Sequence, residues 1–194
     1  MEKYIIWDKK HITGPAWVFF NTKWELLCVI EREGEKQNKS WKRAGQLFVP
    51  AWKKRAHEKM EETMIRELWE ETWIKKELNI ISELSLESKW LLSLHTNDVN
   101  IDIEVFTSMK EFDPQILEKC NKFFEYEIIQ RTFINIREIL EFDIDKIRPW
   151  LYEILYLFYG CGEIQNAIKL ENGQYSKKEM KRIEKIKQEI YDLL

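Results

Sequence analysis

Glycine, proline and cysteine are all scarce in this chain of 194 residues, which contains six, four and three of them. The cysteines, Cys28, Cys120 and Cys161, are scattered and form no CxxC pair, so neither a disulfide framework nor a zinc site is predicted. A basic surplus is also missing, because 34 acidic residues outnumber 31 basic ones. We therefore expect no nucleic acid polymer as partner. The cysteine pattern predicts a reducing compartment, the cytoplasm.

Long apolar runs are absent as well. No stretch approaches the roughly 20 apolar residues that cross a bilayer, and we expect no membrane association. Apolar residues still make up 44% of the chain, which is enough to bury one core. We expect one domain over residues 1–148 and a helical extension over residues 149–194. This extension packs on the domain by default, and a homodimer contact is the second expectation.

Tryptophan is unusually frequent, since the nine tryptophans exceed the six glycines. Several tryptophans stand where glycine is usual. Trp24 follows Asn21-Thr22-Lys23 between two apolar runs, where a hairpin normally has glycine. Trp150 follows Pro149, and Pro-Gly is a common turn pair while Pro-Trp is not.

The segment between residues 52 and 74 carries the chemistry. The stretch from Lys59 to Thr72 lacks Gly and Pro and is rich in Glu, Met, Leu and Arg, which predicts a helix. Three of its glutamates, Glu67, Glu70 and Glu71, stand at i, i+3 and i+4, so their carboxylates converge on one helix face. Such hard oxygen ligands suit Mg²⁺ or Mn²⁺ shared with substrate phosphates. The apolar stripe of the helix is Met60, Met64, Ile65 and Leu68.

A solvated acidic face would explain a lone pair of glutamates, but the full pattern is more specific. Glu58 is followed by seven residues and then by Arg66-Glu67-Leu68-Trp69-Glu70-Glu71, with Ile74 closing the run. This segment resembles the box of the Nudix hydrolases. That pattern is Gly, five residues, Glu, seven residues, then Arg-Glu-apolar-x-Glu-Glu-x-Gly-apolar. Every charged and apolar position matches, while Trp52 and Trp73 replace the two glycines.

The resemblance implies an α/β fold, a Nudix-type α/β/α sandwich with a central mixed β-sheet, plus the C-terminal helical extension. It also implies Mg²⁺- or Mn²⁺-dependent hydrolysis of a pyrophosphate bond in a nucleoside diphosphate linked to another group. The resemblance favours a small-molecule nucleotide like ADP-ribose or a nucleotide sugar. With glycine at position 52, Pro50-Ala51-Trp52 resembles the Pro-Ala-Gly found in the pyrophosphatases that act on those substrates. The alternative is a catalytically impaired Nudix domain that binds a nucleotide or a protein, as the missing glycines suggest.

The resemblance also assigns roles. Glu67, Glu70, Glu71 and the Ala51 carbonyl hold the metal, while Arg66 and Glu58 join loop and helix. Spacing alone also offers Glu62 as the partner of Arg66. The base is Glu67 or a downstream acid, and the downstream candidates are Glu111, Glu125 and Glu127. Three basic residues follow Trp52 in the loop, namely Lys53, Lys54 and Arg55. A role in phosphate contact and simple surface solvation explain them equally well.

One hypothesis covers Trp24, Trp52, Trp73 and Trp150. The gene comes from a bacterial lineage that reads UGA as glycine, and the codon has been translated here as tryptophan. Trp7, Trp41 and Trp90 fit the same set, while Trp17 and Trp69 fit either reading. The competing explanation is a divergent protein that fills its pocket with indoles.

Patterning predicts the remaining elements. Asp102 and Glu104 alternate with apolar residues and therefore share one strand face, which is turned either to solvent or to the substrate cleft. Ser176 and Glu179 form a capping box ahead of a helix with one apolar stripe. The expected strands are 16–20, 25–30, 45–50, 80–86, 89–95, 100–107 and 132–136, and the expected helices are 136–141, 151–159 and 176–194.

Overall fold

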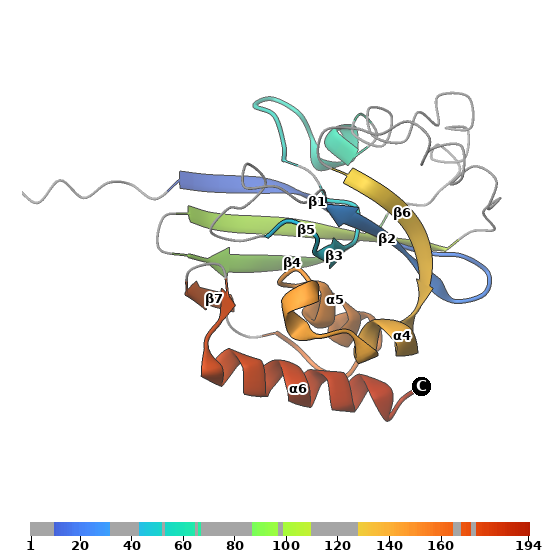
Figure 1. Cartoon of the computed structure of the whole chain (residues 1–194). Coiled ribbons are helices and arrows are strands. Elements are labelled where there is room, and N and C mark those ends of the chain that lie inside the picture. Colours follow the sequence, from blue (N-terminus) through green and yellow to red (C-terminus); the bar gives the residue numbers. More distant parts are fainter. Residues whose placement is uncertain are drawn as a thin grey trace, which may run out of the picture.

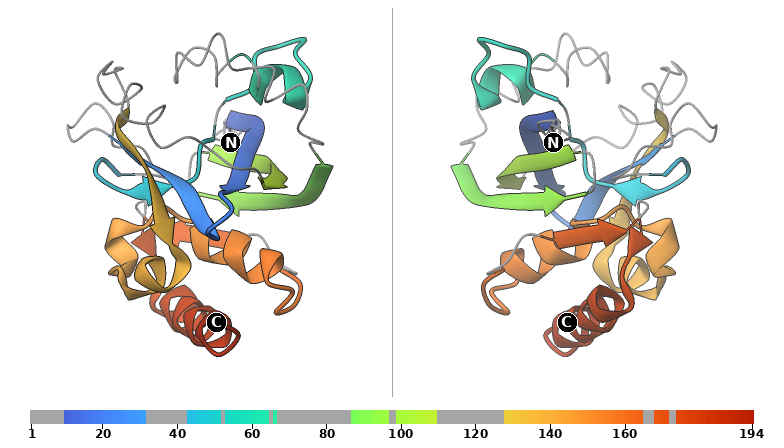
Figure 2. Two further views of the ribbon diagram at one scale, coloured as in Figure 1. Left: turned by 90° about the vertical axis from the view of Figure 1, so that its right-hand side faces the viewer. Right: turned by 90° about the vertical axis from the view of Figure 1, so that its left-hand side faces the viewer.

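The computed structural model describes residues 10–31, 43–51, 53–64, 66, 87–96, 99–109, 128–164, 168–171 and 174–194. Its strands form one sheet, with the helical segment at residues 60–64 on one side and helices α4, α5 and α6 on the other (Figure 1, Figure 2). The strands are β1 (Lys10–Phe20), β2 (Glu25–Glu31), β3 (Leu47–Phe48), β4 (Glu87–His95), β5 (Val99–Met109), β6 (Ile128–Asn135), β7 (Ile168–Glu171) and β8 (Gln174–Tyr175). The helices are α4 (Ile136–Glu141), the 3-10 turn η2 (Ile144–Lys146), α5 (Leu151–Phe158) and α6 (Lys177–Tyr191).

The sheet is mixed, as predicted. Its strand order is β3-β2-β1-β5-β4-β7-β8, and β6 pairs with β2 outside this path. The central pair, β1 and β5, is parallel and runs in unbroken register from Lys10 opposite Val99 to Phe20 opposite Met109. Antiparallel pairs join β4 to β5 and β2 to β1. This pairing confirms the expected central mixed sheet.

Side-chain alternation explains how β5 is buried. Ile101, Ile103 and Val105 are buried in the main core, while Asp102 and Glu104 between them are half-buried. Because successive side chains of a strand point to opposite faces, the two acids lie on the face away from that core. In β1 every residue from Gly14 to Phe20 is buried, so here both faces of the sheet are covered.

The main core lies between the sheet and helix α5. Trp150, Leu151, Tyr152, Ile154 and Leu155 are all fully buried there. The Tyr152 hydroxyl reaches the carbonyls of Ile139 and Phe142 at 3.3 and 3.2 Å, which ties α5 to the end of α4. Helix α6 covers this layer from outside with Ile183, Ile186 and Ile190, all buried (Figure 1). Three residues of the apolar stripe predicted for the last helix are therefore covered within the chain, while its two end residues, Met180 and Leu193, are exposed.

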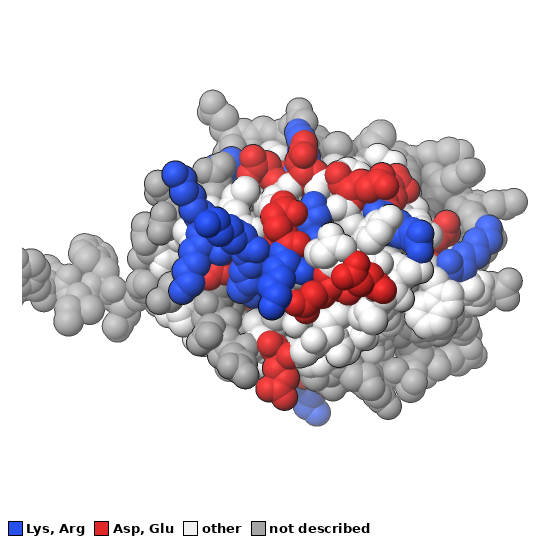
Figure 3. Space-filling model, turned by 90° about the horizontal axis from the view of Figure 1, so that it is seen from below, with Lys and Arg blue, Asp and Glu red and all other residues white. Residues whose placement is uncertain are grey.

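Helix α6 begins as its sequence predicts. Ser176 is the N-cap, and its hydroxyl accepts from the Glu179 amide at 3.3 Å. The Glu179 carboxylate instead accepts from Arg182 Nε at 2.7 Å. The outer face is polar, and lysines gather over the first half of the helix (Figure 3). These exposed lysines are Lys177, Lys178, Lys181 and Lys185.

Several predicted bounds need correction. Strand β1 begins at Lys10 rather than Ala16, because the parallel pairing with β5 extends it. The strand expected over 45–50 is only Leu47–Phe48, since the chain then leaves β2 for β1. Strands β7 and β8 were not expected, because they are too short to show a period. The strand expected over 80–86 lies outside the described residues. No helix in the described part is long and apolar enough to span a membrane.

Candidate functional site

The loop that enters the box runs beside β1. Ala51 faces Ala16 in an antiparallel bridge. The hydrogen bonds belong to flanking residues, since the Trp17 amide donates to the Pro50 carbonyl and the Lys54 amide donates to the Thr13 carbonyl, both at 2.8 Å. A residue in such a non-hydrogen-bonded pair directs its own N–H and C=O away from the partner strand. The Ala51 carbonyl is therefore turned away from β1, an orientation that fits a metal ligand.

Arg66 and Glu58 form a two-pronged ion pair at the base of this loop. Arg66 Nε lies 2.6 Å from Glu58 Oε1, and Arg66 Nη2 lies 3.0 Å from Glu58 Oε2. Thr63 Oγ also donates to Glu58 Oε2 at 2.9 Å. Hydrogen bonding from Arg66, helped by Thr63, lowers the pKa of Glu58 to about 2. Glu58 is therefore an ionised tether between the loop and the helix.

Glu62 has a different role from the one its spacing suggested. Its carboxylate Oε2 accepts from the Lys59 amide at 2.8 Å, at the first turn of the helical segment over residues 60–64. An acid at this position caps the otherwise unpaired amides of a helix start. The expectation that Glu62 holds Arg66 is therefore corrected, because Glu58 forms that ion pair.

The helical segment is anchored by its buried side. Thr63 and Met64 have no exposed surface, and Met60 is half-buried. Two stripe residues of the prediction, Ile65 and Leu68, lie outside the described residues. Met60 and Met64, the described residues of the predicted apolar stripe, therefore face the interior as expected.

The three carboxylates expected to bind the metal lie outside the described residues. Within the described ranges, no three His, Cys, Asp or Glu side chains are grouped so that they could hold a metal ion. Trp52 and Trp73 also fall outside these ranges. The predicted acids that lie outside the described residues are Glu67, Glu70, Glu71, Glu111, Glu125 and Glu127.

The three basic residues of the loop differ in their surroundings. Lys54 is half-buried, and its ammonium donates to the Glu58 carbonyl at 2.8 Å, so it helps to close the loop. Lys53 and Arg55 are exposed. The Arg55 carbonyl accepts from the Glu58 amide at 3.3 Å, in a tight turn whose third residue, His57, has φ +74°. The Nudix pattern that this segment resembles often has glycine at this position.

Strand pairing assembles a polar cluster that sequence spacing could not reveal. Asp102 accepts from Ser93 Oγ at 2.5 Å and lies 2.6 Å from His11 Nε2. These residues come from β5, β4 and β1, and His11 is exposed. In the sequence, only the alternation around Asp102 pointed to this cluster. It predicts the face of the strand on which Asp102 lies but not which residues of other strands are next to it.

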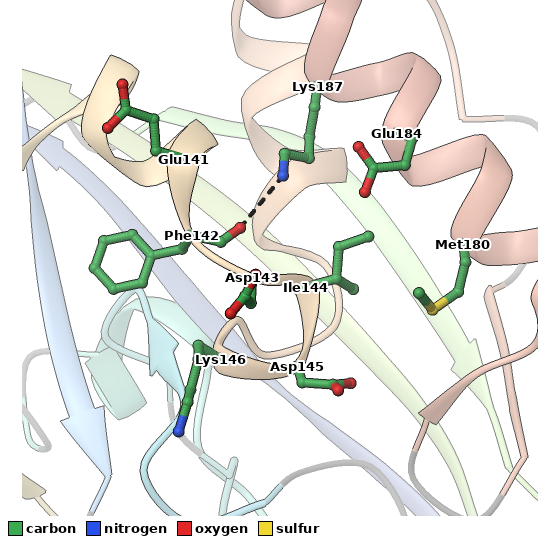
Figure 4. A pocket seen from close by; sticks show the side chains of 9 residues that line it. All are labelled: Glu141, Phe142, Asp143, Ile144, Asp145, Lys146, Met180, Glu184 and Lys187. Atoms are coloured by element: carbon green, nitrogen blue, oxygen red, sulfur yellow. Dashed lines mark hydrogen bonds between the residues drawn. The ribbon is translucent and has the colours of Figure 1, made fainter.

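A hollow of about 400 Å³ lies between helix α6 and the segment after α4 (Figure 4). Lys187 reaches across it to the Phe142 carbonyl at 3.3 Å. The strands lie between α6, which contributes Met180, Glu184 and Lys187 to the lining, and the helical segment at residues 60–64 (Figure 1). The hollow is therefore no part of the box site. Its charged lining consists of Glu141, Asp143, Asp145, Lys146, Glu184 and Lys187.

Solved structures resemble this chain, although no family model and no curated protein matches it. A MutT protein from Methanosarcina mazei superposes with a TM-score of 0.53 at 20% identity, over 73% of this chain and 87% of its own. A NUDIX hydrolase from Nitrosomonas europaea superposes with a TM-score of 0.52 at 17% identity, and the match covers 87% of this chain and 95% of the hydrolase. Likeness at these identities concerns the fold. Together with the mixed sheet and the loop beside β1, it shows that this chain has the Nudix fold.

Proposed function

We propose that the protein is a pyrophosphohydrolase that cleaves a nucleoside diphosphate linked to another group, with Mg²⁺ or Mn²⁺ as cofactor. The observation that carries the proposal is the ion pair between Arg66 and Glu58, with both oxygens of the carboxylate engaged. It fixes the loop to the helix in the segment whose spacing matches the box. In the sequence, Glu67 follows Arg66 directly and is the first of the three acids that the box pattern assigns to the metal.

The residues divide the work. Ala51 would offer its carbonyl from the loop, and Glu67, Glu70 and Glu71, which the box pattern assigns to the metal, would offer carboxylates. Oxygen donors of this kind fit a hard divalent cation. When bound, this ion activates water and neutralises the charge of the diphosphate. Glu67 or a downstream acid takes the proton from the water.

The described residues also limit the binding roles. Lys54 is engaged by the Glu58 carbonyl, so we assign it to loop closure. Lys53 and Arg55 are exposed at the loop surface and are the residues proposed to contact phosphate. The substrate class that we propose is a nucleotide like ADP-ribose or a nucleotide sugar.

The test measures hydrolysis of ADP-ribose, nucleotide sugars, dinucleoside polyphosphates and nucleoside triphosphates, with and without Mg²⁺. The chain is compared with Trp52→Gly/Trp73→Gly and with Glu61→Gln, which changes an exposed acid of the same helix. We expect turnover only with the metal, and higher turnover in the double variant. Nucleotide binding without turnover in both versions would favour the alternative, a binding module. Absence of both binding and turnover would overturn the proposal.

A further inference from the structure

Trp24 stands in a hairpin loop that requires a left-handed residue. The Trp24 amide donates to the Asn21 carbonyl, and the Asn21 amide donates to the Glu25 carbonyl, both at 3.1 Å. Trp24 then joins the turn to β2 with φ +60°. Three-residue hairpin loops place glycine at this position, because a side chain there is strained. The Trp24 side chain is 54% exposed, so packing does not demand an indole.

Trp150 stands in a second turn with the same requirement. The Leu151 amide donates to the Arg148 carbonyl at 3.4 Å across Pro149 and Trp150. Trp150 has φ 87° and ψ −22°. Proline followed by a residue near φ +80° and ψ 0° defines a type II turn, whose third position calls for glycine.

The buried indole of Trp150 is also poorly accommodated. Its ring has no exposed surface, and its Nε1 has no hydrogen-bond partner among the described residues. A buried tryptophan usually finds a partner for this N–H. Trp150 thus combines a strained backbone with a polar atom that burial leaves unsatisfied.

Two other tryptophans in the described part behave ordinarily. Trp17 lies within β1 and Trp90 lies within β4, and neither has positive φ. Trp17 packs against Phe19, with ring centroids 4.7 Å apart. The backbone therefore separates Trp24 and Trp150 from Trp17 and Trp90.

We propose that positions 24 and 150 are glycine in the protein that its own organism makes, because both codons are UGA and are read there as glycine. Both turns then have the residue that their backbone requires. The proposal rests on turn geometry and is independent of the proposed hydrolysis. It extends to Trp52 and Trp73, which replace glycine in the box.

His57 shows that positive φ alone does not identify such a codon. It has φ +74° in an exposed turn, yet histidine is enriched among the non-glycine residues found in this region. For a bulky residue such as tryptophan, the same φ is an outlier. The proposal therefore rests on tryptophan in two glycine-type turns, not on strain in general.

The direct test reads the gene and the natural protein. We expect UGA at codons 24 and 150, and glycine at both positions in peptides sequenced by mass spectrometry from the natural organism. UGG at either codon would overturn the proposal for that position. Tryptophan in those peptides, despite UGA codons, would overturn it for both.

A second test compares Gly and Ala variants, which remove the same indole and differ in tolerance of positive φ. We expect Trp24→Gly and Trp150→Gly to melt above Trp24→Ala and Trp150→Ala, on the order of 2 to 4 °C for a chain of this size. Trp17→Gly should instead melt below Trp17→Ala, because glycine weakens a strand. Equal or higher melting of the Ala variants at 24 and 150 would remove the structural basis.

Discussion

The guanidinium of Arg182 in α6 donates to the carboxylate of Glu153 in α5, with 2.9 Å between Nη2 and Oε1. Glu153 is completely buried, and the Tyr175 hydroxyl lies 3.4 Å from its other oxygen. The same hydroxyl accepts from the Trp150 amide at 3.2 Å. One network thus joins both helices, β8 and the turn before α5. Its members have to stay paired, because an unpaired buried charge is costly.

Arg182→Met should lower the free energy of unfolding by about 3 to 5 kcal/mol, as when one partner of a buried ion pair is removed. Urea unfolding followed by circular dichroism measures the change. Lys185→Met is the matched control, because Lys185 is 78% exposed and pairs with Glu189 on the surface of the same helix. That control should stay within about 0.5 kcal/mol of the parent. Equal effects of the two variants would contradict the role of the network.

The same variant should change the dependence of stability on pH. Burial raises the pKa of Glu153 above its ordinary value of 4.5, while Arg182 opposes the shift. Between pH 4.5 and the folded pKa, the folded state holds a proton that the unfolded state has released, so stability falls as pH rises across this window. Above the folded pKa, Glu153 is ionised and paired with Arg182, and stability levels off. Without Arg182 the pKa rises further. Arg182→Met should then lose more stability at pH 8 than at pH 5, and a loss independent of pH would count against this account.

Glu58→Gln should weaken the link between the loop and the helix. Arg66 holds the pKa of Glu58 at about 2, below its ordinary 4.5. The stabilisation is therefore complete above pH 4.5 and is lost as pH falls toward 2. Melting curves should show the variant below the parent at pH 7, with the gap closing in acid. Glu61→Gln, the exposed control, should melt like the parent throughout.

In the same variant, hydrolysis should fall by about 10- to 100-fold, as when a residue that positions metal ligands is changed. The effect should appear in kcat measured at saturating Mg²⁺ on the Trp52→Gly/Trp73→Gly background. Unchanged kcat would mean that the tether supports the fold without supporting the chemistry.

Glu67→Gln should remove most of the metal-dependent turnover, by about 10²- to 10⁴-fold if Glu67 also acts as base. Glu70→Gln and Glu71→Gln should mainly weaken the response to Mg²⁺, because each removes one hard oxygen ligand. Initial rates across a Mg²⁺ titration separate the two effects. Full activity in all three variants would show that this acidic face is not the metal site.

Trp24→Gly should raise the free energy of unfolding by about 1 kcal/mol. Relief of the left-handed strain outweighs the extra backbone entropy of glycine. Little packing is lost, since the indole is half exposed and its ring centroid lies 6.0 Å from that of Phe20. Chemical denaturation measures the change, and Trp17→Gly should be destabilising in the same assay. A Trp24→Gly variant less stable than the parent would show that the indole packs usefully.

The sequence by itself determined the local features. Alternation placed Asp102 and Glu104 on one face of β5, the Ser176 motif started α6, and helical spacing buried Ile183, Ile186 and Ile190. Glycine-type turns were also predictable at Trp24 and Trp150, because their neighbours are turn residues. Such features depend on residues a few positions apart, whose geometry is set by the helix or strand period.

Only the tertiary structure decided which distant groups meet. His11 and Asp102 are 91 positions apart and meet because β1 and β5 pair in one register, which local patterning does not specify. Glu58 rather than Glu62 forms the ion pair with Arg66, because the loop folds back on the helix and brings Glu58 within 2.6 Å of the guanidinium. The buried pair of Glu153 and Arg182 likewise needed the packing of α5 against α6. Long-range contacts follow from how elements dock, and docking depends on the whole core rather than on any one segment.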